Sequence, residues 1–349
     1  MVRTGWWRTL ARVAAFGMAW VATPALAAVC NASPTVTTAA GPYSPAAVNE
    51  GKAPALVSSA GLTCSSSLLV VLGSNTVSAT FSSANSGATG LVLKGSAGQI
   101  GYTASADPGG TVPLTQGKTT EYLQNNVLNA LGLLGANNGT LPVYLKLASG
   151  TTPAPGRYTD VITITWDWRV CNGISALLCV GTYERPVGVV KTEITITLDV
   201  SAQDMTIALS SATKWDAING TTRPLAVPGS KGRTTLAVRN PDLVALGSIA
   251  LVYKVPARTS IVLDGDGTTS PTIIGFTDGS PASGVTFGYV PASTTDDVEF
   301  SADDGVSWNY APVAGNRSSE AAITHLRFRP KGAMKAGTTF TLSFPYLLR

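Results

Sequence analysis

The chain has 349 residues, with 24 lysines and arginines against 20 aspartates and glutamates, and a formal net charge of +4 at pH 7. Charged residues make up 13% of it, about half the usual share of about 25% in globular proteins. The first 27 residues hold three arginines and no acid, so the remainder is nearly neutral. A neutral chain without a run of basic residues argues against a nucleic-acid partner. The length is enough for two domains of ordinary size.

The N-terminal segment, residues 1–27, has the pattern of a secretory signal peptide. Three arginines precede an apolar run at 13–21, and the small-residue sequence Ala-Leu-Ala occupies 25–27. The apolar run is too short to span a bilayer. We therefore predict export through the periplasm and a mature chain without a transmembrane segment.

Four cysteines follow the predicted leader: Cys30, Cys64, Cys171 and Cys179. An even number of cysteines in an exported protein indicates disulfides. Three pairings are possible, and the economical one joins Cys30 to Cys64 and Cys171 to Cys179. The spacing does not fit a structural zinc site, and the single histidine, His325, is far away in the sequence. We expect no metal and no other cofactor.

The mature chain has the composition and spacing of an all-β protein. Turn residues recur between short segments in which apolar and polar residues alternate. We predict two immunoglobulin-like β-sandwich domains in tandem, over residues 28–204 and 205–349. Residues 120–134 are the exception, because their helix-like spacing favours a short helix or a long apolar loop. The junction at 201–204 offers no flexible linker.

One segment, residues 156–179, joins a turn, a strand and two cysteines. Gly156, Tyr158 and Asp160 occupy alternate positions after a Pro-Gly turn. The same alternation continues through four large apolar residues, Ile162, Ile164, Trp166 and Trp168. Alternate residues of a strand share one face, so this pattern predicts a stripe of core side chains.

The loop between the last two cysteines is apolar, which is unusual for a loop unless it packs against something. Its candidate binding residues are Ile174, Leu177 and Leu178, with Val180 just beyond it. Two interpretations remain open: these side chains cap the core of their own domain, or they form an exposed hydrophobic binding tip. Leu131, Leu133 and Leu134 are a second candidate set.

No set of residues predicts catalysis. A serine or cysteine mechanism would depend on His325, which we expect on a solvated strand face beside Arg327 and Arg329. The sequence Asp264-Gly-Asp266-Gly lacks the glutamate of an EF-hand calcium loop and predicts a turn. Trp308, near Asp303 and Asp304, is the only candidate for a sugar platform.

An ordered set of residues in the first half resembles a known family. The set comprises Cys30, Cys64, Ile100-Gly-Tyr102, Leu141-Pro-Val-Tyr144, Gly156-x-Tyr158-x-Asp160, Trp166-Asp-Trp168, Cys171, Cys179 and Val200-x-x-x-Asp204. Together they resemble the spore coat protein U domain over residues 28–204. They are most similar to the N-terminal domain of the two-domain tip subunits of Csu-type archaic chaperone–usher pili. More weakly, the segments at 228–240 and 298–308 resemble a DUF11-like surface repeat.

The resemblance implies a non-enzymatic protein of the cell surface, a fimbrium or the extracellular space. It would be a tip-like or accessory pilus subunit that acts in adhesion and biofilm formation. Its expected partners are a periplasmic pilus chaperone, an usher, pilin subunits, and an abiotic or host surface. Cys30 follows the predicted cleavage site so closely that we expect no N-terminal donor strand.

Two further expectations concern assembly. The last segment, with Phe340, Leu342, Phe344 and Tyr346, is a candidate for the sheet edge with which a chaperone would pair. One alternative function is a structural coat or matrix protein that assembles without donor strands. A less favoured alternative is a carbohydrate-binding protein.

Overall fold

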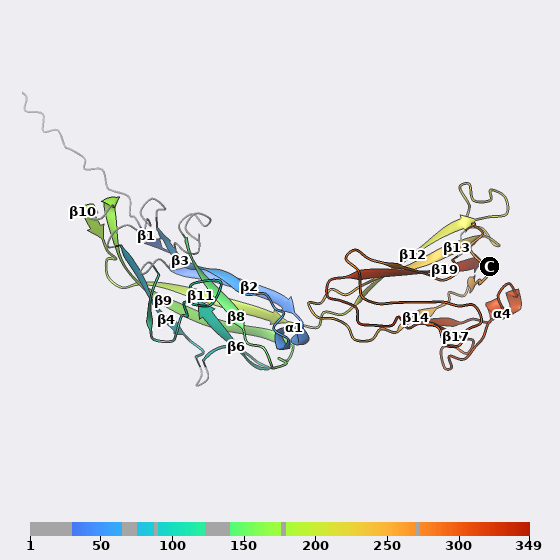
Figure 1. Ribbon diagram of the computed structural model, residues 1–349, viewed down its shortest axis with the longest axis horizontal. Coiled ribbons are helices and arrows are strands. Elements are labelled where there is room, and N and C mark those ends of the chain that lie inside the picture. The colour runs from blue at the N-terminus through green and yellow to red at the C-terminus, as the bar shows by residue number, and fades with distance from the viewer. Residues whose placement is uncertain (1–29, 65–74, 87–89, 123–139, 176–178, 270–271) are drawn as a thin grey trace, which may run out of the picture.

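The computed structural model describes residues 30–64, 75–86, 90–122, 140–175, 179–269 and 272–349, without the side chains of 172–180. The predicted leader and the second set of apolar candidates, Leu131, Leu133 and Leu134, lie outside these residues. Strands dominate the described chain, and its helices α1 (Pro45–Asn49) and α4 (Arg317–Ala321) are short (Figure 1). The all-β prediction is confirmed. None of the described helices is long and apolar enough to cross a membrane.

The N-terminal half, residues 30–204, contains eleven strands of one extensively paired sheet. They are β1 (Cys30–Ala32), β2 (Thr35–Tyr43), β3 (Leu56–Cys64), β4 (Thr76–Ser83), β5 (Leu91–Gly95), β6 (Gly98–Ser105), β7 (Thr119–Glu121), β8 (Thr140–Leu147), β9 (Gly156–Ser175), β10 (Cys179–Glu184) and β11 (Val190–Val200). The order is β1-β3-β8-β6-β5-β9-β11-β2, and β4 and β10 also pair with β9. Strand β7 occupies the start of the predicted helix or loop at 120–134, and most of that segment lies outside the described residues.

The long strand β9 organises this half because it pairs with four others, β4, β5, β10 and β11. Ile162 and Ile164 are fully buried, and Trp166 and Trp168 are 2% and 5% exposed. Opposite Trp166 lie Ala79 of β4 and Val190 of β11. The predicted core stripe of β9 is therefore confirmed.

The C-terminal half, residues 205–349, is built from two smaller antiparallel sheets. Its strands are β12 (Thr206–Trp215), β13 (Lys231–Arg239), β14 (Leu251–Lys254), β15 (Thr259–Ile261), β16 (Gly275–Asp278), β17 (Val298–Ser301), β18 (His325–Phe328) and β19 (Thr339–Leu348). One sheet has the order β12-β13-β19-β15, with β16 also on β19, and the other has the order β14-β18-β17. A core that includes Val238, Phe328 and Phe344 fills the space between them.

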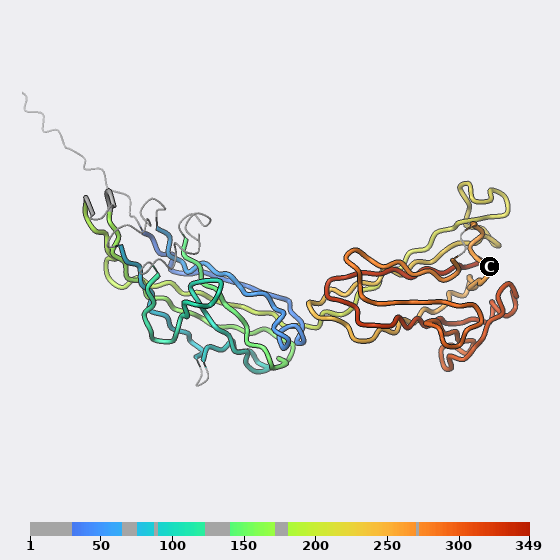
Figure 2. The backbone as a smooth tube through the Cα atoms, in the orientation of Figure 1, coloured from blue at the N-terminus to red at the C-terminus, as the bar shows by residue number. Residues whose placement is uncertain are grey.

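The two halves have separate hydrophobic cores and lie end to end (Figures 1 and 2). The chain crosses between them just after β11, where Ser201 N donates to Tyr43 O over 3.0 Å. Close packing continues at Gly41, which has a φ of +96°, because an added Cβ would lie 2.3 Å from Asp199 O. Only glycine fits both that conformation and that approach. Figure 1 also shows α1 at the end of the N-terminal half that faces the C-terminal half.

Candidate functional site

The Gly-x-Tyr-x-Asp motif places a buried carboxylate at the beginning of the β9 core stripe. Asp160 is 1% exposed, and its Oδ2 accepts hydrogen bonds of 2.6 Å from both Ser83 Oγ and Tyr102 OH. Its Oδ1 accepts from the backbone N of Asn85 at 3.1 Å and of Val161 at 2.8 Å. Burial, followed by the bond to Asp160, raises the pKa of Tyr102 above its usual range, which keeps this hydroxyl protonated as a donor. The motif residue Asp160 therefore links β4, β6 and β9.

The other motif residues also have structural contacts. Tyr158 is 1% exposed and donates from its hydroxyl to Ala154 O over 2.7 Å. Trp166 Nε1 donates to Thr192 Oγ1 over 3.2 Å, and that hydroxyl in turn donates to Ser33 O over 2.8 Å. Trp168 Nε1 has no hydrogen-bond partner among the described residues. The buried side chains of Tyr158, Trp166 and Trp168 therefore contribute to the core of the N-terminal half.

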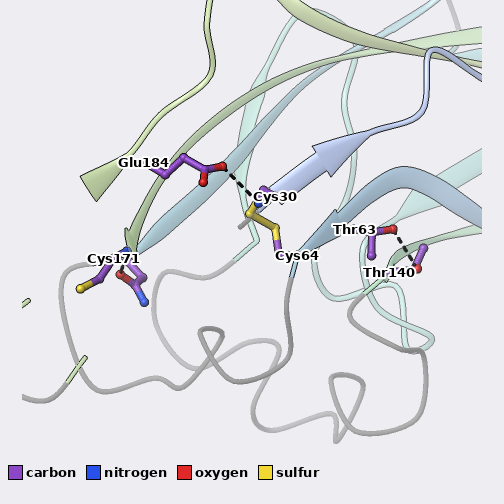
Figure 3. Close-up of a disulfide and its surroundings, with 7 residues drawn as sticks. Cys30, Thr63, Cys64, Thr140, Cys171 and Glu184 are labelled. Atoms are coloured by element: carbon purple, nitrogen blue, oxygen red, sulfur yellow. Dashed lines mark hydrogen bonds between the residues drawn. A yellow bond between two sulfur atoms is a disulfide. The ribbon is translucent and has the colours of Figure 1, made fainter. Parts of the chain in front are cut away.

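One predicted disulfide is present at the far end of the N-terminal half. Cys30 and Cys64 pair directly across β1 and β3 and form a disulfide (Figure 3). Cys30 N also donates to Glu184 Oε1 over 3.2 Å, which ties β10 to the disulfide. Cys171 is disulfide-bonded as well. The pairing of Cys171 with Cys179 stays a prediction, because the side chain of Cys179 lies outside the described residues.

The hairpin of β9 and β10 carries the predicted binding loop. It reaches the end of the N-terminal half that is farthest from the C-terminal half (Figure 1). The Arg169 guanidinium lies 3.8 Å from the centroid of the Tyr183 ring at the base of this hairpin. The backbones of Ile174 and Val180 lie opposite each other. Their side chains, and all of Leu177 and Leu178, lie outside the described residues, so the binding role of these four stays a prediction.

An uncovered apolar edge, which sequence analysis did not identify, lies on β12. Ile207 is directly opposite Val238, and Leu209 is directly opposite Leu236. Directly opposed residues of an antiparallel pair lie on the same side of the sheet. Val238 and Leu236 are 0% and 6% exposed in the core, whereas Ile207 and Leu209 are 50% and 59% exposed. The core-facing side of β12 is thus left open, and within the described chain β13 is the one strand that pairs with it.

The prediction that the last strand forms the sheet edge for assembly is wrong. Strand β19 lies inside its sheet, with β13 on one side and β15 and β16 on the other. Phe340, Leu342 and Phe344 are at most 1% exposed. These residues belong to the core, and the free edge of the same sheet is β12. The alternation in the sequence identified a strand but not its position in the sheet.

The prediction that His325 lies on a solvated strand face is also wrong. The side chain is 9% exposed, because Trp308 lies beside it with ring centroids 6.5 Å apart and ring planes at 78°. Its Nδ1 lies 3.2 Å from Thr324 Oγ1, and no contact with a carboxylate creates a catalytic pair among the described residues. Trp308 therefore covers the side of β18 that was expected to face solvent.

The acidic turns hold no metal cluster in the part of the chain that the structure describes. Asp264 forms ion pairs with Lys231 and Arg317, and Asp266 forms one with Arg233. Asp303 accepts hydrogen bonds from Ser301 Oγ at 2.7 Å and Ser307 Oγ at 2.6 Å within its own turn. The carboxylates of Asp264, Asp266 and Asp303 thus interact with donors of the protein itself.

These observations define an all-β protein in two halves that lie end to end, with a disulfide in the first half and an open strand edge in the second. Residues 18–165 match the family model of the Spore Coat Protein U domain, which confirms the resemblance of the first half to that domain. No curated protein matches the sequence.

Solved structures show more distant likeness. The chain is similar to the CsuC–CsuE chaperone–tip adhesion subunit pre-assembly complex of Acinetobacter baumannii, with 11% identity, a TM-score of 0.40, and 90% of this chain and 93% of that chain covered. A putative membrane-anchored protein of Corynebacterium diphtheriae has 8% identity and a TM-score of 0.21, with 91% of this chain and 50% of that chain covered. The T6 backbone pilin of Streptococcus pyogenes has 10% identity and a TM-score of 0.22, with 78% and 51% covered. All three likenesses are weak, so the assignment of the first half depends on the family match.

Proposed function

We propose that this chain is an exported, non-enzymatic surface subunit of pilus type that joins its fibre through the C-terminal half. The observation that carries the proposal is the uncovered core-facing side of β12, where Ile207 and Leu209 are about half exposed. The Spore Coat Protein U match over 18–165 supports it, because the sequence resemblance within that family is to pilus subunits. The two halves are two domains in this proposal, dividing between residues 204 and 205.

Strand addition is the mode of binding that fits this edge. An exposed edge strand presents unpaired backbone N–H and C=O groups, and a partner strand that pairs with them gains main-chain hydrogen bonds. Side chains of the added strand would cover Ile207 and Leu209, which removes apolar surface from water. A periplasmic pilus chaperone would pair with β12 first. At the usher, a strand of a pilin subunit would then replace the chaperone on β12.

Adhesion would be performed by the opposite end of the molecule. The β9–β10 hairpin points away from the C-terminal half (Figure 1), so a fibre attached at β12 leaves that hairpin free to touch an abiotic or host surface. Leu177 and Leu178 would make apolar contact there, and adhesion would support biofilm formation. The place of such a subunit is the tip of the fibre.

Immunogold electron microscopy on the native cells tests the function. An antibody raised against residues 205–349 labels fibre ends if the chain is a tip subunit, and labels the whole length if it is an accessory or repeating subunit. Label that coats cells or matrix without any fibre overturns the pilus proposal and favours the structural coat alternative. A strain that lacks the gene serves as the control for antibody specificity.

A double variant tests the adhesive hairpin separately. Replacing Leu177 and Leu178 by serine leaves secretion and folding intact and reduces attachment to a polystyrene surface. Val187→Ser, at a side chain that is 98% exposed on the turn after β10, is the matched control. Unchanged attachment of the double variant contradicts the hairpin mechanism without affecting the fibre assignment.

A further inference from the structure

A small cavity lies beside β17 in the C-terminal half, between the segments at 289–294 and 308–312, where Tyr310 N donates to Phe300 O of β17 over 3.2 Å. Its volume is about 180 Å³, and Tyr289, Trp308 and Tyr310 line it together with Glu299 and Asn309. With Phe300, four aromatic rings and several groups able to form hydrogen bonds thus surround one space. Binding sites for small molecules combine apolar walls with a few placed polar groups in this way.

Two of the aromatic side chains in the cavity wall, Tyr310 and Tyr289, are held in place by contacts with other residues of the protein. Tyr310 donates from its hydroxyl to Ser319 O over 2.9 Å. Tyr289 packs edge-on against Phe300, with centroids 6.5 Å apart and ring planes at 74°. Because these two rings are fixed before any ligand arrives, they would lose little conformational freedom on binding.

The charges at the cavity are already compensated. Glu299 forms ion pairs with Arg327 and, at 3.6 Å, with Arg329. The Arg327 guanidinium lies 4.4 Å from the centroid of the Trp308 ring, and Arg327 does not line the cavity. A second cation at this ring would compete with Arg327 for the same π electrons, so the site favours a neutral ligand.

The wall of the cavity also contains a strained residue. Ala292 lines the cavity and has a φ of +60°, at a turn closed by Ser293 N donating to Val290 O over 3.1 Å. Position i+2 of such a turn after a proline is usually glycine, and alanine there costs about 1 kcal/mol. Strained backbone of this kind tends to occur at binding sites.

We propose that this cavity binds a pyranose unit of a neutral saccharide. The apolar C–H face of the sugar ring packs against Trp308 and Tyr289, and its hydroxyls form hydrogen bonds with Asn309 and Ser293. Sequence analysis offered Asp303 and Asp304 as the polar partners of Trp308, but Asp303 is occupied within its own turn. The site is independent of strand addition at β12.

Saturation-transfer difference NMR on the full mature chain tests the proposal. The probes are methyl β-glucopyranoside, methyl β-galactopyranoside and N-acetylglucosamine at millimolar concentration, with choline as a cationic comparison. We expect transfer to the ring protons of at least one sugar and none to choline. No transfer to any of the three sugars overturns the proposal, as does binding of choline alone.

Variants locate the binding. Trp308→Ala raises the dissociation constant about tenfold or more, which corresponds to a loss of about 1.4 kcal/mol in binding free energy. The control Val306→Ser, at a side chain that is 84% exposed outside the cavity, leaves the dissociation constant unchanged. Trp308 also covers His325, so a second variant guards against loss of folding. Asn309→Ala, at an exposed position, weakens binding several-fold in a folded chain. Affinity that survives both variants overturns the proposal.

Discussion

Ser44 Oγ donates a hydrogen bond of 2.8 Å to Asp242 Oδ1, and the two residues belong to opposite halves of the molecule. Both are buried, at 4% and 6% exposed. Ser44 Oγ also accepts from Ala47 N over 2.9 Å as the N-cap of α1. Asp242 Oδ1 accepts in addition from Leu243 N over 2.6 Å. One hydroxyl thus begins a helix in the first half and fixes it to the loop after β13 in the second.

We predict that Ser44→Ala couples energetically to Asp242. The variant loses about 1 kcal/mol from the helix cap and about 1 kcal/mol from the hydrogen bond between the halves. A double-mutant cycle with Asp242→Ala, measured by urea unfolding, isolates the second contribution. Additive losses would contradict a working contact between the halves. Small-angle scattering then reports whether the variants bend more freely at 201–204.

The buried carboxylate of the family motif leads to a second prediction. Asp160→Asn puts an amide N–H where two hydroxyls or two backbone N–H groups now donate. We expect a loss of about 3 kcal/mol or more, because buried donors are left without acceptors. Tyr102→Phe removes one donor and costs only about 1 kcal/mol. Equal losses for the two variants in urea unfolding would show that the carboxylate is not the centre of this network.

Replacement by phenylalanine should lower the stability of the protein by different amounts at the two tryptophans of β9. Trp166 Nε1 donates to Thr192, whereas Trp168 Nε1 has no described partner. Trp166→Phe therefore costs more than Trp168→Phe, by about 1 kcal/mol for the lost hydrogen bond. Alanine at either position costs about 3–5 kcal/mol. A larger loss for Trp168→Phe in thermal unfolding would contradict the described contacts.

A charged substitution on the open edge of β12 should impair fibre assembly without lowering the stability of the isolated chain. Leu209→Lys changes the stability of the isolated chain by no more than about 0.5 kcal/mol, because the side chain is 59% exposed. The same variant reduces the amount of chain recovered in sheared surface fibres, because an added strand would bury the charge. Ala208→Lys, whose side chain points to the other side of β12, is the matched control. Equal recovery of both variants would contradict assembly through this edge.

Acid stability depends partly on Asp216. Hydrogen bonds from the backbone N–H groups of Asn219 and Leu225 hold the pKa of this carboxyl at about 2, below its usual value of 3.8. The stability that they supply is present above the unfolded pKa and is lost as the pH falls through the folded one. Asp216→Asn therefore lowers stability at neutral pH and flattens its decline between about pH 4 and pH 2. An unchanged acid limb in unfolding experiments would exclude this role.

The local sequence pattern was enough to predict the core face of β9, the presence of disulfides and the family of the first half. Period-two alternation put Ile162, Ile164, Trp166 and Trp168 on one face, because a strand directs successive side chains to opposite sides. Cysteine number and the predicted leader indicated disulfides, and the Cys30–Cys64 pair is present. The ordered motifs of the first half indicated the Spore Coat Protein U domain.

Only the tertiary structure decided which apolar strands are covered. Ile207 and Leu209 alternate in sequence as Leu342 and Phe344 do, yet the first pair is about half exposed and the second is buried. The difference is position in the sheet, which depends on pairing between residues distant in the chain. The same applies to His325, which Trp308 covers, and to the cavity at β17, whose aromatic walls come from separate loops. Alternation fixes the direction of a side chain, whereas burial requires a partner from elsewhere in the fold.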